Sequence, residues 1–240
     1  MINDRGPRVI VPLDVESSAA AKAVCEQLDP ASCRVKIGKE LFTREGPAVV
    51  EQAQRAGFGV FLDLKYHDIP NTVAQACRAA ASLGCWMVNV HASGGRAMLE
   101  AARDALAGES HRPLLIAVTV LTSLDDAALT ELGITDGTAR HAERLAKLTF
   151  DCGLDGVVCS PLEARALRAR FGPAFLLVTP GVRPAGAARD DQQRIATPGQ
   201  AVRDGSDYLV IGRPIVRADD PRAALAAING EIEREVSTAR

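Results

Sequence analysis

One pattern, a short apolar run followed by a helical stretch, repeats eight times along this sequence. The apolar runs are continuous rather than alternating, which is typical of parallel strands covered by helices on both faces. The expected strands lie at residues 8–14, 33–38, 59–65, 86–91, 113–121, 155–160, 174–180 and 207–212. The expected helices lie at residues 17–28, 39–56, 70–83, 95–107, 125–132, 138–152, 161–171, near 198–204, and 220–236.

This alternation predicts a closed (β/α)8 barrel. Eight units in a chain of 240 residues average about 30 residues each, which fits such a barrel and leaves few residues for insertions. No Ser- or Pro-rich linker divides the chain, so we expect a single domain over residues 1–240. A doubly wound open sheet is the alternative. The turn after the first expected strand, DVESSA, lacks the glycines that a dinucleotide-binding sheet places there.

Composition argues against several classes of function. The net charge is −2, from 28 basic and 30 acidic residues, which is not the balance of a nucleic-acid-binding protein. Aromatic residues make up 4% of the chain, too few to favour a platform for single strands. No apolar run approaches the ~20 residues of a membrane span, and the N-terminal segment lacks the order of a signal peptide. We therefore expect a cytoplasmic protein that binds neither nucleic acid nor membrane.

The cysteines, histidines and lysines narrow the chemistry further. The six cysteines form no CxxC pair and lie mostly in apolar segments, which indicates buried thiols rather than disulfides. The four histidines show no zinc-ligand spacing, so we expect no metal site. Of the 28 basic residues only five are Lys. A lysine retained in such an Arg-rich chain indicates a position where a transferable proton is needed.

Charged residues gather at the ends of the first three expected strands. Asp14 closes the first, Lys36 lies within the second, and Asp63 and Lys65 close the third. Because side chains alternate along a strand, Asp63 and Lys65 share a face and Lys36 points inward. Barrel active sites lie at the carboxyl ends of strands that are ~4.8 Å apart, so we expect one cluster of alternating charge. A purely structural ion-pair network is the alternative.

The third expected strand continues as DLKYHDIPNT at residues 63–72, which adds Asp68 to the charged set. With its surroundings, this stretch resembles the orotidine monophosphate decarboxylase family, and the resemblance covers nearly the whole chain. The other pieces that carry it are PLDV (12–15), VKIG (35–38), VNVHASGG (88–95), AVTVLTS (117–123), TPGVRP (179–184), DDQQRIATP (190–198) and IGRPI (211–215). Their order and spacing are those of the bacterial form.

The resemblance implies decarboxylation of orotidine 5'-monophosphate to uridine 5'-monophosphate, the final step of pyrimidine nucleotide synthesis, with no metal or other cofactor. It implies that Lys65 is the proton donor and that Asp63 presses against the substrate carboxylate and orients Lys65. Lys36 would pair with Asp63 and reach the ribose. Asp68 and Thr72 would enter the active site of the other subunit, so the resemblance implies a homodimer.

The remaining expected contacts bind the substrate away from the reacting carbon. The loops after the last two barrel strands often hold phosphate, and segment 181–198 is long enough for a lid that grips it. The resemblance implies Asp14 at the ribose. Thr122 is expected at the base or ribose, with a turn residue as the alternative. Arg183, Gln192, Gly212 and Arg213 are expected at the phosphate, where Gly212 allows close approach of the backbone.

Two other functions compete with this interpretation. A sister sugar-phosphate lyase would need a divalent metal and is not expected to carry Asn71 and Thr72 after the DIP tripeptide. A catalytically dead barrel would bind only a nucleotide or a protein, but the intact charges argue against it. His91 is a weaker candidate for holding Lys65, and a hydrogen-bonded core histidine is its alternative.

Overall fold

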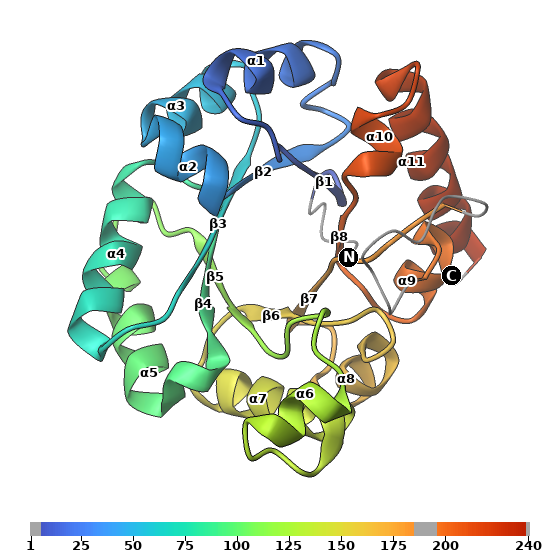
Figure 1. Cartoon of the computed structure of the whole chain (residues 1–240). Coiled ribbons are helices and arrows are strands. Elements are labelled where there is room, and N and C mark those ends of the chain that lie inside the picture. The colour runs from blue at the N-terminus through green and yellow to red at the C-terminus, as the bar shows by residue number, and fades with distance from the viewer. Residues whose placement is uncertain (1–5, 185–195, 239–240) are drawn as a thin grey trace.

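The computed structural model describes residues 6–184 and 196–238. Its eight parallel strands form a closed barrel in sequence order, with β8 paired to β1, and helices surround the ring of strands (Figure 1). The predicted (β/α)8 barrel is confirmed. The strands are β1 (Val9–Pro12), β2 (Arg34–Gly38), β3 (Val60–Tyr66), β4 (Met87–His91), β5 (Leu114–Val118), β6 (Gly156–Val158), β7 (Leu176–Thr179) and β8 (Tyr208–Val210).

The helices follow the predicted order, with one division that the sequence analysis missed and two short elements that it did not predict, Ala92–Gly94 and Arg213–Val216. The predicted helix 39–56 is two helices, because Gly46 has φ of +63° and Pro47 follows it. The helices are α1 (Ser18–Glu26), α2 (Lys39–Glu45), α3 (Ala48–Arg55), α4 (Pro70–Ser82), the 3-10 turn η1 (Ala92–Gly94), α5 (Gly95–Leu106), α6 (Asp126–Glu131), α7 (Gly137–Asp151), α8 (Ala164–Phe171), α9 (Pro198–Arg203), α10 (Arg213–Val216) and α11 (Pro221–Thr238).

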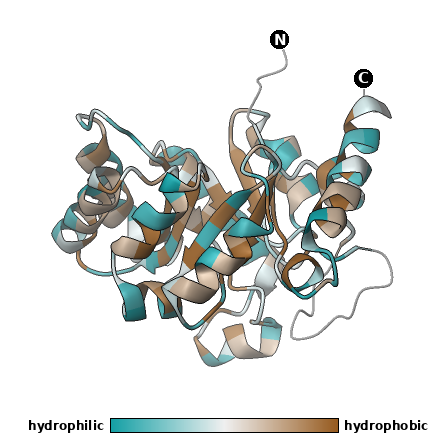
Figure 2. Cartoon of the chain, turned by 90° about the horizontal axis from the view of Figure 1, so that it is seen from above, coloured by the Kyte–Doolittle hydropathy of each residue, from teal (hydrophilic) through white to brown (hydrophobic). Residues whose placement is uncertain are grey.

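Strand side chains divide between the barrel interior and the layer beneath the helices. The interior is filled by Ile10, Phe61, Met87, Ile116, Leu176, Val178 and Tyr208. The neighbours of these residues along the strands, such as Val11, Leu62 and Val88, pack outward in the larger cluster between strands and helices. Hydrophobic residues accordingly concentrate on the strands, and hydrophilic residues on the outer faces of the helices (Figure 2). The barrel is therefore a packed core and not a pore.

A cation–π contact fills the N-terminal end of the barrel. The guanidinium carbon of Arg34 lies 4.0 Å from the centre of the Trp86 ring and 5.3 Å from that of Tyr208. Arg34 also donates a hydrogen bond to the carbonyl of Pro7. With this end filled, inward-facing polar side chains have room only toward the carboxyl ends of the strands.

Two further expectations concern cysteines and membranes. All six cysteines are buried, as expected, and carry free thiols. Burial raises the pKa of the thiols of Cys33, Cys77 and Cys85 to about 12. Within the described ranges, no helix combines the length and the apolar character that crossing a bilayer requires.

Candidate active site

Four charged side chains, one just after β1 and three from β2 and β3, meet at the carboxyl end of the barrel. Lys36 Nζ lies 3.3 Å from Asp14 Oδ1 and 3.3 Å from Asp63 Oδ2. Lys65 Nζ lies 2.6 Å from the other carboxylate oxygen, Asp63 Oδ1. The structure thus brings together the four residues that strand alternation grouped, in the order Asp14, Lys36, Asp63, Lys65.

Asp63 is the buried centre of this cluster, with 7% of its surface exposed. Burial alone would raise the pKa of its carboxyl. The charges of Lys36 and Lys65 outweigh that effect, together with hydrogen bonds from Lys65 and Asn89, and hold the pKa of Asp63 below its usual range. The site therefore keeps an ionised carboxylate between two ammonium groups.

Lys65 has an unusual backbone conformation. Among the described residues it is the only non-glycine residue with a positive φ, at +53°. The pairing of β3 with β4 shifts register between Leu62 and Tyr66, around this position. The N–H group of Lys65 donates a hydrogen bond of 2.8 Å to the side-chain oxygen of Asn89. The sequence analysis treated Lys65 as an ordinary extended strand residue, and this expectation was wrong in its local geometry.

Asn89 is a buried polar residue to which the sequence analysis assigned no function. It lies on the inner face of β4, is fully buried, and donates a hydrogen bond of 2.7 Å from Nδ2 to Asp63 Oδ1. One signal for it was present in the sequence. An amide flanked by Val88 and Val90 in an apolar strand needs buried hydrogen-bond partners, and the neighbouring strand carries charged ones.

His91, at the end of β4, lies close to a second histidine. The rings of His91 and His67 are 5.4 Å apart, centre to centre. Burial lowers the pKa of His91 to about 4, with further contributions from His67, Lys39 and Lys65. His91 is therefore a neutral ring near neutral pH.

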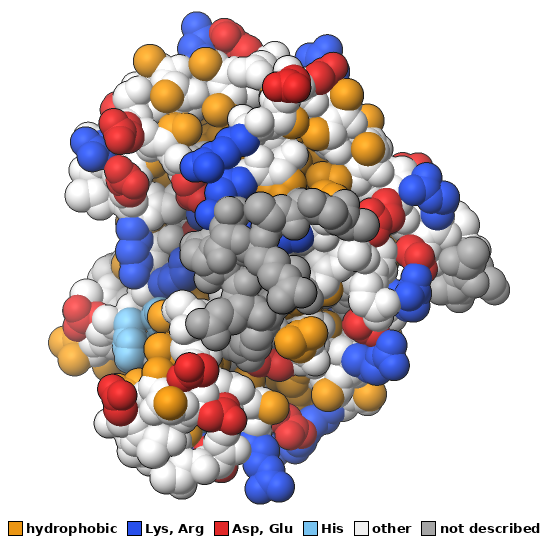
Figure 3. Space-filling view, turned by 45° about the vertical axis from the view of Figure 1, so that its right-hand side comes forward, with side chains coloured by type: hydrophobic (Ala, Val, Ile, Leu, Met, Phe, Trp, Pro, Cys, Tyr) orange, Lys and Arg blue, Asp and Glu red, His pale blue; other side chains and the backbone are white. Residues whose placement is uncertain are grey.

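A cavity of about 190 Å³ adjoins the charged cluster. One wall is charged, with Lys36, Asp63 and Lys65, and the remainder is mostly apolar. Thr122 lies on this lining, as expected for a substrate contact, and Cys159 does too. Figure 3 shows basic side chains gathered near the centre of the face that it draws, with acidic side chains among them. A cavity with one charged wall and a mostly apolar remainder suits a flat ring that carries a charged substituent.

The residues expected at the phosphate follow β7 and β8. Arg183 is 7% exposed and donates from Nη1 to the carbonyl of Val182 at 3.0 Å, while Arg213 begins α10 and is half-buried. The Arg183 N–H donates to the Ala196 carbonyl at 2.9 Å, which joins the two ends of segment 181–198. Gln192 and the rest of residues 185–195 lie outside the described residues.

Gly212, between these arginines and the barrel, is constrained by packing. A Cβ atom at this position would lie 2.7 Å from Pro12 Cγ, closer than carbon atoms approach. The glycine therefore lets the β8–α10 turn lie against β1. Packing against Pro12 is therefore one reason for a glycine at this position. The close approach of the backbone to phosphate, expected from the sequence, is a second.

Known proteins resemble this chain over nearly its whole length. Residues 7–228 match the Orotidine 5'-phosphate decarboxylase / HUMPS family. The orotidine 5'-phosphate decarboxylase of Halorhodospira halophila is 62% identical over 226 residues, which cover 94% of this chain and 96% of that protein. The chain belongs to the orotidine 5'-phosphate decarboxylase / HUMPS family.

Two further relatives agree with this membership. The orotidine 5'-phosphate decarboxylase of Chromobacterium violaceum is 62% identical over 224 residues, covering 93% of this chain and 91% of that protein. The crystal structure of orotidine 5'-phosphate decarboxylase from Lactobacillus acidophilus superimposes with a TM-score of 0.84 at 42% identity. That match covers 95% of this chain and 99% of that one.

Two expected site residues of this family member lie away from the cluster. Asp68 and Thr72 are exposed, in the turn after β3 and the first turn of α4. The Asp68 carboxylate accepts a hydrogen bond of 2.6 Å from the N–H of Ile69, and within the described ranges it makes no ion pair. The single chain therefore presents these two side chains outward.

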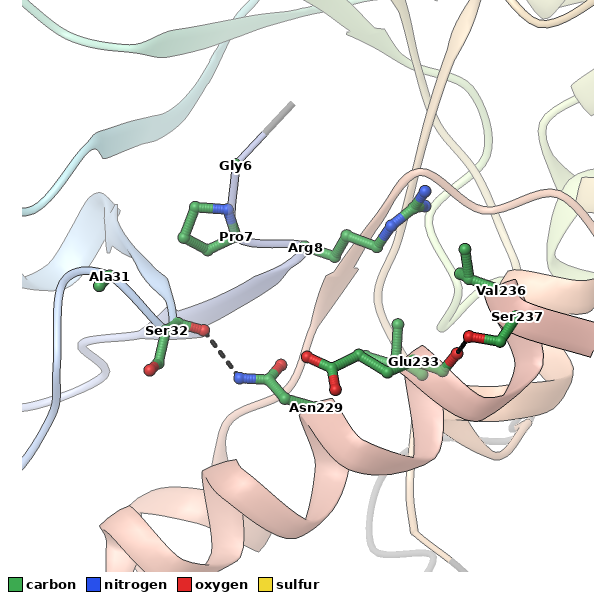
Figure 4. Close-up of a pocket in the computed structure, with 10 residues that line it drawn as sticks. Gly6, Pro7, Arg8, Ala31, Ser32, Asn229, Glu233, Val236 and Ser237 are labelled. Carbon is green, nitrogen blue, oxygen red and sulfur yellow. Dashed lines mark hydrogen bonds between the residues drawn. The ribbon is translucent and has the colours of Figure 1, made fainter. Parts of the chain in front are cut away.

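A larger cleft, of about 730 Å³, lies at the opposite end of the barrel (Figure 4). Its side chains come mainly from α11 and from the segments before β1 and β2. Polar side chains of the cleft donate hydrogen bonds to backbone carbonyls of the chain. Asn229 donates to the Ser32 carbonyl and Ser237 to the Glu233 carbonyl, each at 2.9 Å. Because barrel enzymes of this architecture react at the carboxyl ends of their strands, the smaller cavity is the candidate site.

Proposed function

We propose that this chain decarboxylates orotidine 5'-phosphate, with Lys65 supplying the proton that replaces the lost carboxyl group. The activity rests on relatives named for it, which are 56–62% identical over at least 93% of the chain. The chain is accordingly a carboxy-lyase of UMP biosynthesis. The observation that carries the role of Lys65 is its ammonium group, held 2.6 Å from a buried carboxylate on the wall of the cavity.

The reaction requires one bond cleavage and one proton transfer. The bond between the pyrimidine ring and the carboxylate breaks, CO2 leaves, and the electron pair stays on the ring carbon. The Lys65 ammonium stabilises that charge and then transfers a proton to the carbon. The neutral amine regains a proton from water, which restores the enzyme. Arginine would hold the charge but would hardly release a proton, which is consistent with lysine at this position of an Arg-rich chain.

Asp63 has two functions in this proposal. Its ionised carboxylate orients the ammonium of Lys65, and it faces the substrate carboxylate, whose negative charge it disfavours. As CO2 departs, the negative charge moves to the ring carbon beside Lys65. The arrangement therefore favours the transition state over the bound substrate, since its charges are in place before the reaction begins.

The other site residues bind the nucleotide. Lys36 and Asp14, which form an ion pair of 3.3 Å, would contact the ribose hydroxyls. Arg183 and Arg213 would bind the phosphate, since one guanidinium group can donate two parallel hydrogen bonds to phosphate oxygens. Segment 181–198 would grip the phosphate. Further substrate contacts are proposed for Thr122, Gln192 and Gly212.

We further propose that the active enzyme is a homodimer in which Asp68 and Thr72 complete the site of the partner. Their exposure in the single chain supports this arrangement. Ile69, between them, exposes 66% of its surface, and burial of this apolar surface would favour association. A second subunit that covered this turn would bury Ile69 and bring its neighbours to a site.

One experiment separates this function from its alternatives. Purified protein is treated with EDTA, and the loss of orotidine 5'-phosphate absorbance is followed with and without added divalent metal. We expect full activity after chelation, and a loss of roughly 10³-fold or more in Lys65→Ala, which removes both charge and proton. Activity that required added metal would indicate a sister lyase. Nucleotide binding without turnover would indicate a dead barrel.

A further inference from the structure

We infer that Asn89 is a positioning residue for the proton donor: its side-chain amide sets both the backbone of Lys65 and the carboxylate of Asp63. The inference rests on the proposed role of Lys65. Asn89 belongs to β4, the strand next to β3, and is fully buried. The described residues that line the cavity include Lys65 and Asp63 but not Asn89. It therefore acts through these two residues and not on the substrate.

The amide closes a ring of hydrogen bonds. Asn89 Oδ1 accepts from the Lys65 N–H at 2.8 Å, and Asn89 Nδ2 donates to Asp63 Oδ1 at 2.7 Å. The same Asp63 oxygen accepts from Lys65 Nζ at 2.6 Å. The orientation of the amide follows from the partners, because a backbone N–H only donates and an ionised carboxylate only accepts. No apolar residue could make either bond.

The first bond supports the backbone of Lys65. A left-handed conformation is unfavourable for lysine and persists only where the surroundings fix it. Here the register shift between β3 and β4 accompanies it, and the Lys65 N–H bonds to the Asn89 side chain. Without that acceptor the chain gains by rotating toward an extended conformation, which would move Nζ away from its place beside the cavity.

The second bond assigns the two oxygens of the Asp63 carboxylate. Oδ1 receives Asn89 and Lys65, and Oδ2 faces Lys36 at 3.3 Å. A neutral amide donor fixes the plane of the carboxylate without adding a third positive charge. Asn89 therefore keeps each lysine at its own oxygen.

The test compares two substitutions at this position with one elsewhere. Asn89→Asp keeps size and the acceptor for the Lys65 N–H, but it can donate to Asp63 only when protonated. Asn89→Ala removes both bonds. Asn229→Ala is the matched control, because it removes an amide that donates to a carbonyl at the far end of the barrel (Figure 4). The measurements are kcat and KM for orotidine 5'-phosphate across pH, with melting temperatures.

For Asn89→Ala we expect kcat to fall about 10²-fold while KM changes by less than about threefold, since misplaced reacting groups lower kcat. For Asn89→Asp we expect a kcat that is highest at low pH and falls as pH rises, because the neighbouring Asp63 carboxylate repels a second ionised carboxyl. The wild type and Asn229→Ala should not show this decline.

The result that overturns the inference is a normal kcat in Asn89→Ala, or a pH profile of Asn89→Asp that parallels the wild type. A merely structural role would lower melting temperature in both Asn variants and leave the pH profile of kcat unchanged. If Asn89→Ala does not fold, the near-isosteric Asn89→Asp still decides through its profile. Absence of turnover in the wild type would refute the proposed function itself, a distinct outcome.

Discussion

The ammonium of Lys65 lies 2.6 Å from the carboxylate of Asp63, although only one residue separates the two in β3. Lys65 leaves the extended conformation at this point, with φ of +53°. The carboxylate it contacts is buried and ionised. A charged ammonium group is thus fixed at the cavity wall by a partner that stays negative, which suits the proposed proton transfer from Lys65.

Lys65→Arg separates the charge of Lys65 from its proton. Arginine retains a positive charge near Asp63 but hardly releases a proton, so we expect decarboxylation to fall by about 10³-fold or more. Binding of the product nucleotide should weaken far less than turnover. The measurements are steady-state rates and a binding titration with UMP.

The matched control for this substitution is Lys147→Arg. Lys147 also pairs with an aspartate at 2.6 Å, Asp151, but on the outer helix α7. Its replacement should leave turnover unchanged. If Lys65→Arg kept near-normal turnover, Lys65 would not be the proton donor.

Arg213→Ala tests the phosphate site. Loss of a paired contact to phosphate removes about 1.5 to 3 kcal/mol, so KM for orotidine 5'-phosphate should rise roughly 10- to 100-fold. Turnover of the nucleoside orotidine, which has no phosphate, should not change. The exposed Arg217, in the same turn, gives the control variant Arg217→Ala. Equal losses with both substrates would place Arg213 outside the phosphate site.

Mixing two inactive variants tests the shared site. In a dimer of one Asp68→Ala and one Lys65→Ala subunit, one site has both intact residues and the other has neither. Random exchange makes half of the dimers mixed, so about one quarter of the wild-type activity should return in a two-fold symmetric enzyme. Each variant is also assayed alone after the same treatment. Activity that stayed at the sum of the separate variants would rule out a site shared across subunits.

The barrel and the charge cluster were accessible from sequence because both follow from local rules. Continuous apolar runs predict the strands, and alternation places Lys36 and Asp63 on one face. The conformation of Lys65 was not accessible, since it accompanies a register shift between strands and a bond to Asn89, 24 positions away. Gly46 and Pro47 indicate the break between α2 and α3. The sequence analysis missed it because the helical pattern continues on both sides of these two residues.

Gly156→Ala should destabilise the barrel. A Cβ atom at Gly156 in β6 would lie 2.2 Å from the carbonyl oxygen of Leu176 in β7, and backbone in a closed sheet cannot easily move away. We expect a loss of about 1 to 3 kcal/mol in the free energy of unfolding, measured by urea denaturation. Gly108→Ala is the control, because nothing lies within 4 Å of its Cβ position. Equal stability of the two variants would contradict the packing at Gly156.

The last prediction concerns stability in acid. Burial lowers the pKa of His91 to about 4, whereas the unfolded chain has the ordinary histidine value of about 6.5. Between these values the unfolded state binds a proton that the native state does not, so stability falls as pH falls from 6.5 toward 4. Because His91 is only partly buried, its share is on the order of 1 to 2 kcal/mol after solvent screening. In His91→Gln this part of the pH dependence should disappear, as measured by urea denaturation at pH 7 and pH 4.5. The control His111→Gln replaces a ring whose Nε2 lies 2.8 Å from the Cys85 carbonyl, and it should keep this pH dependence. A His91→Gln curve parallel to the wild type would show that His91 is not the titrating group.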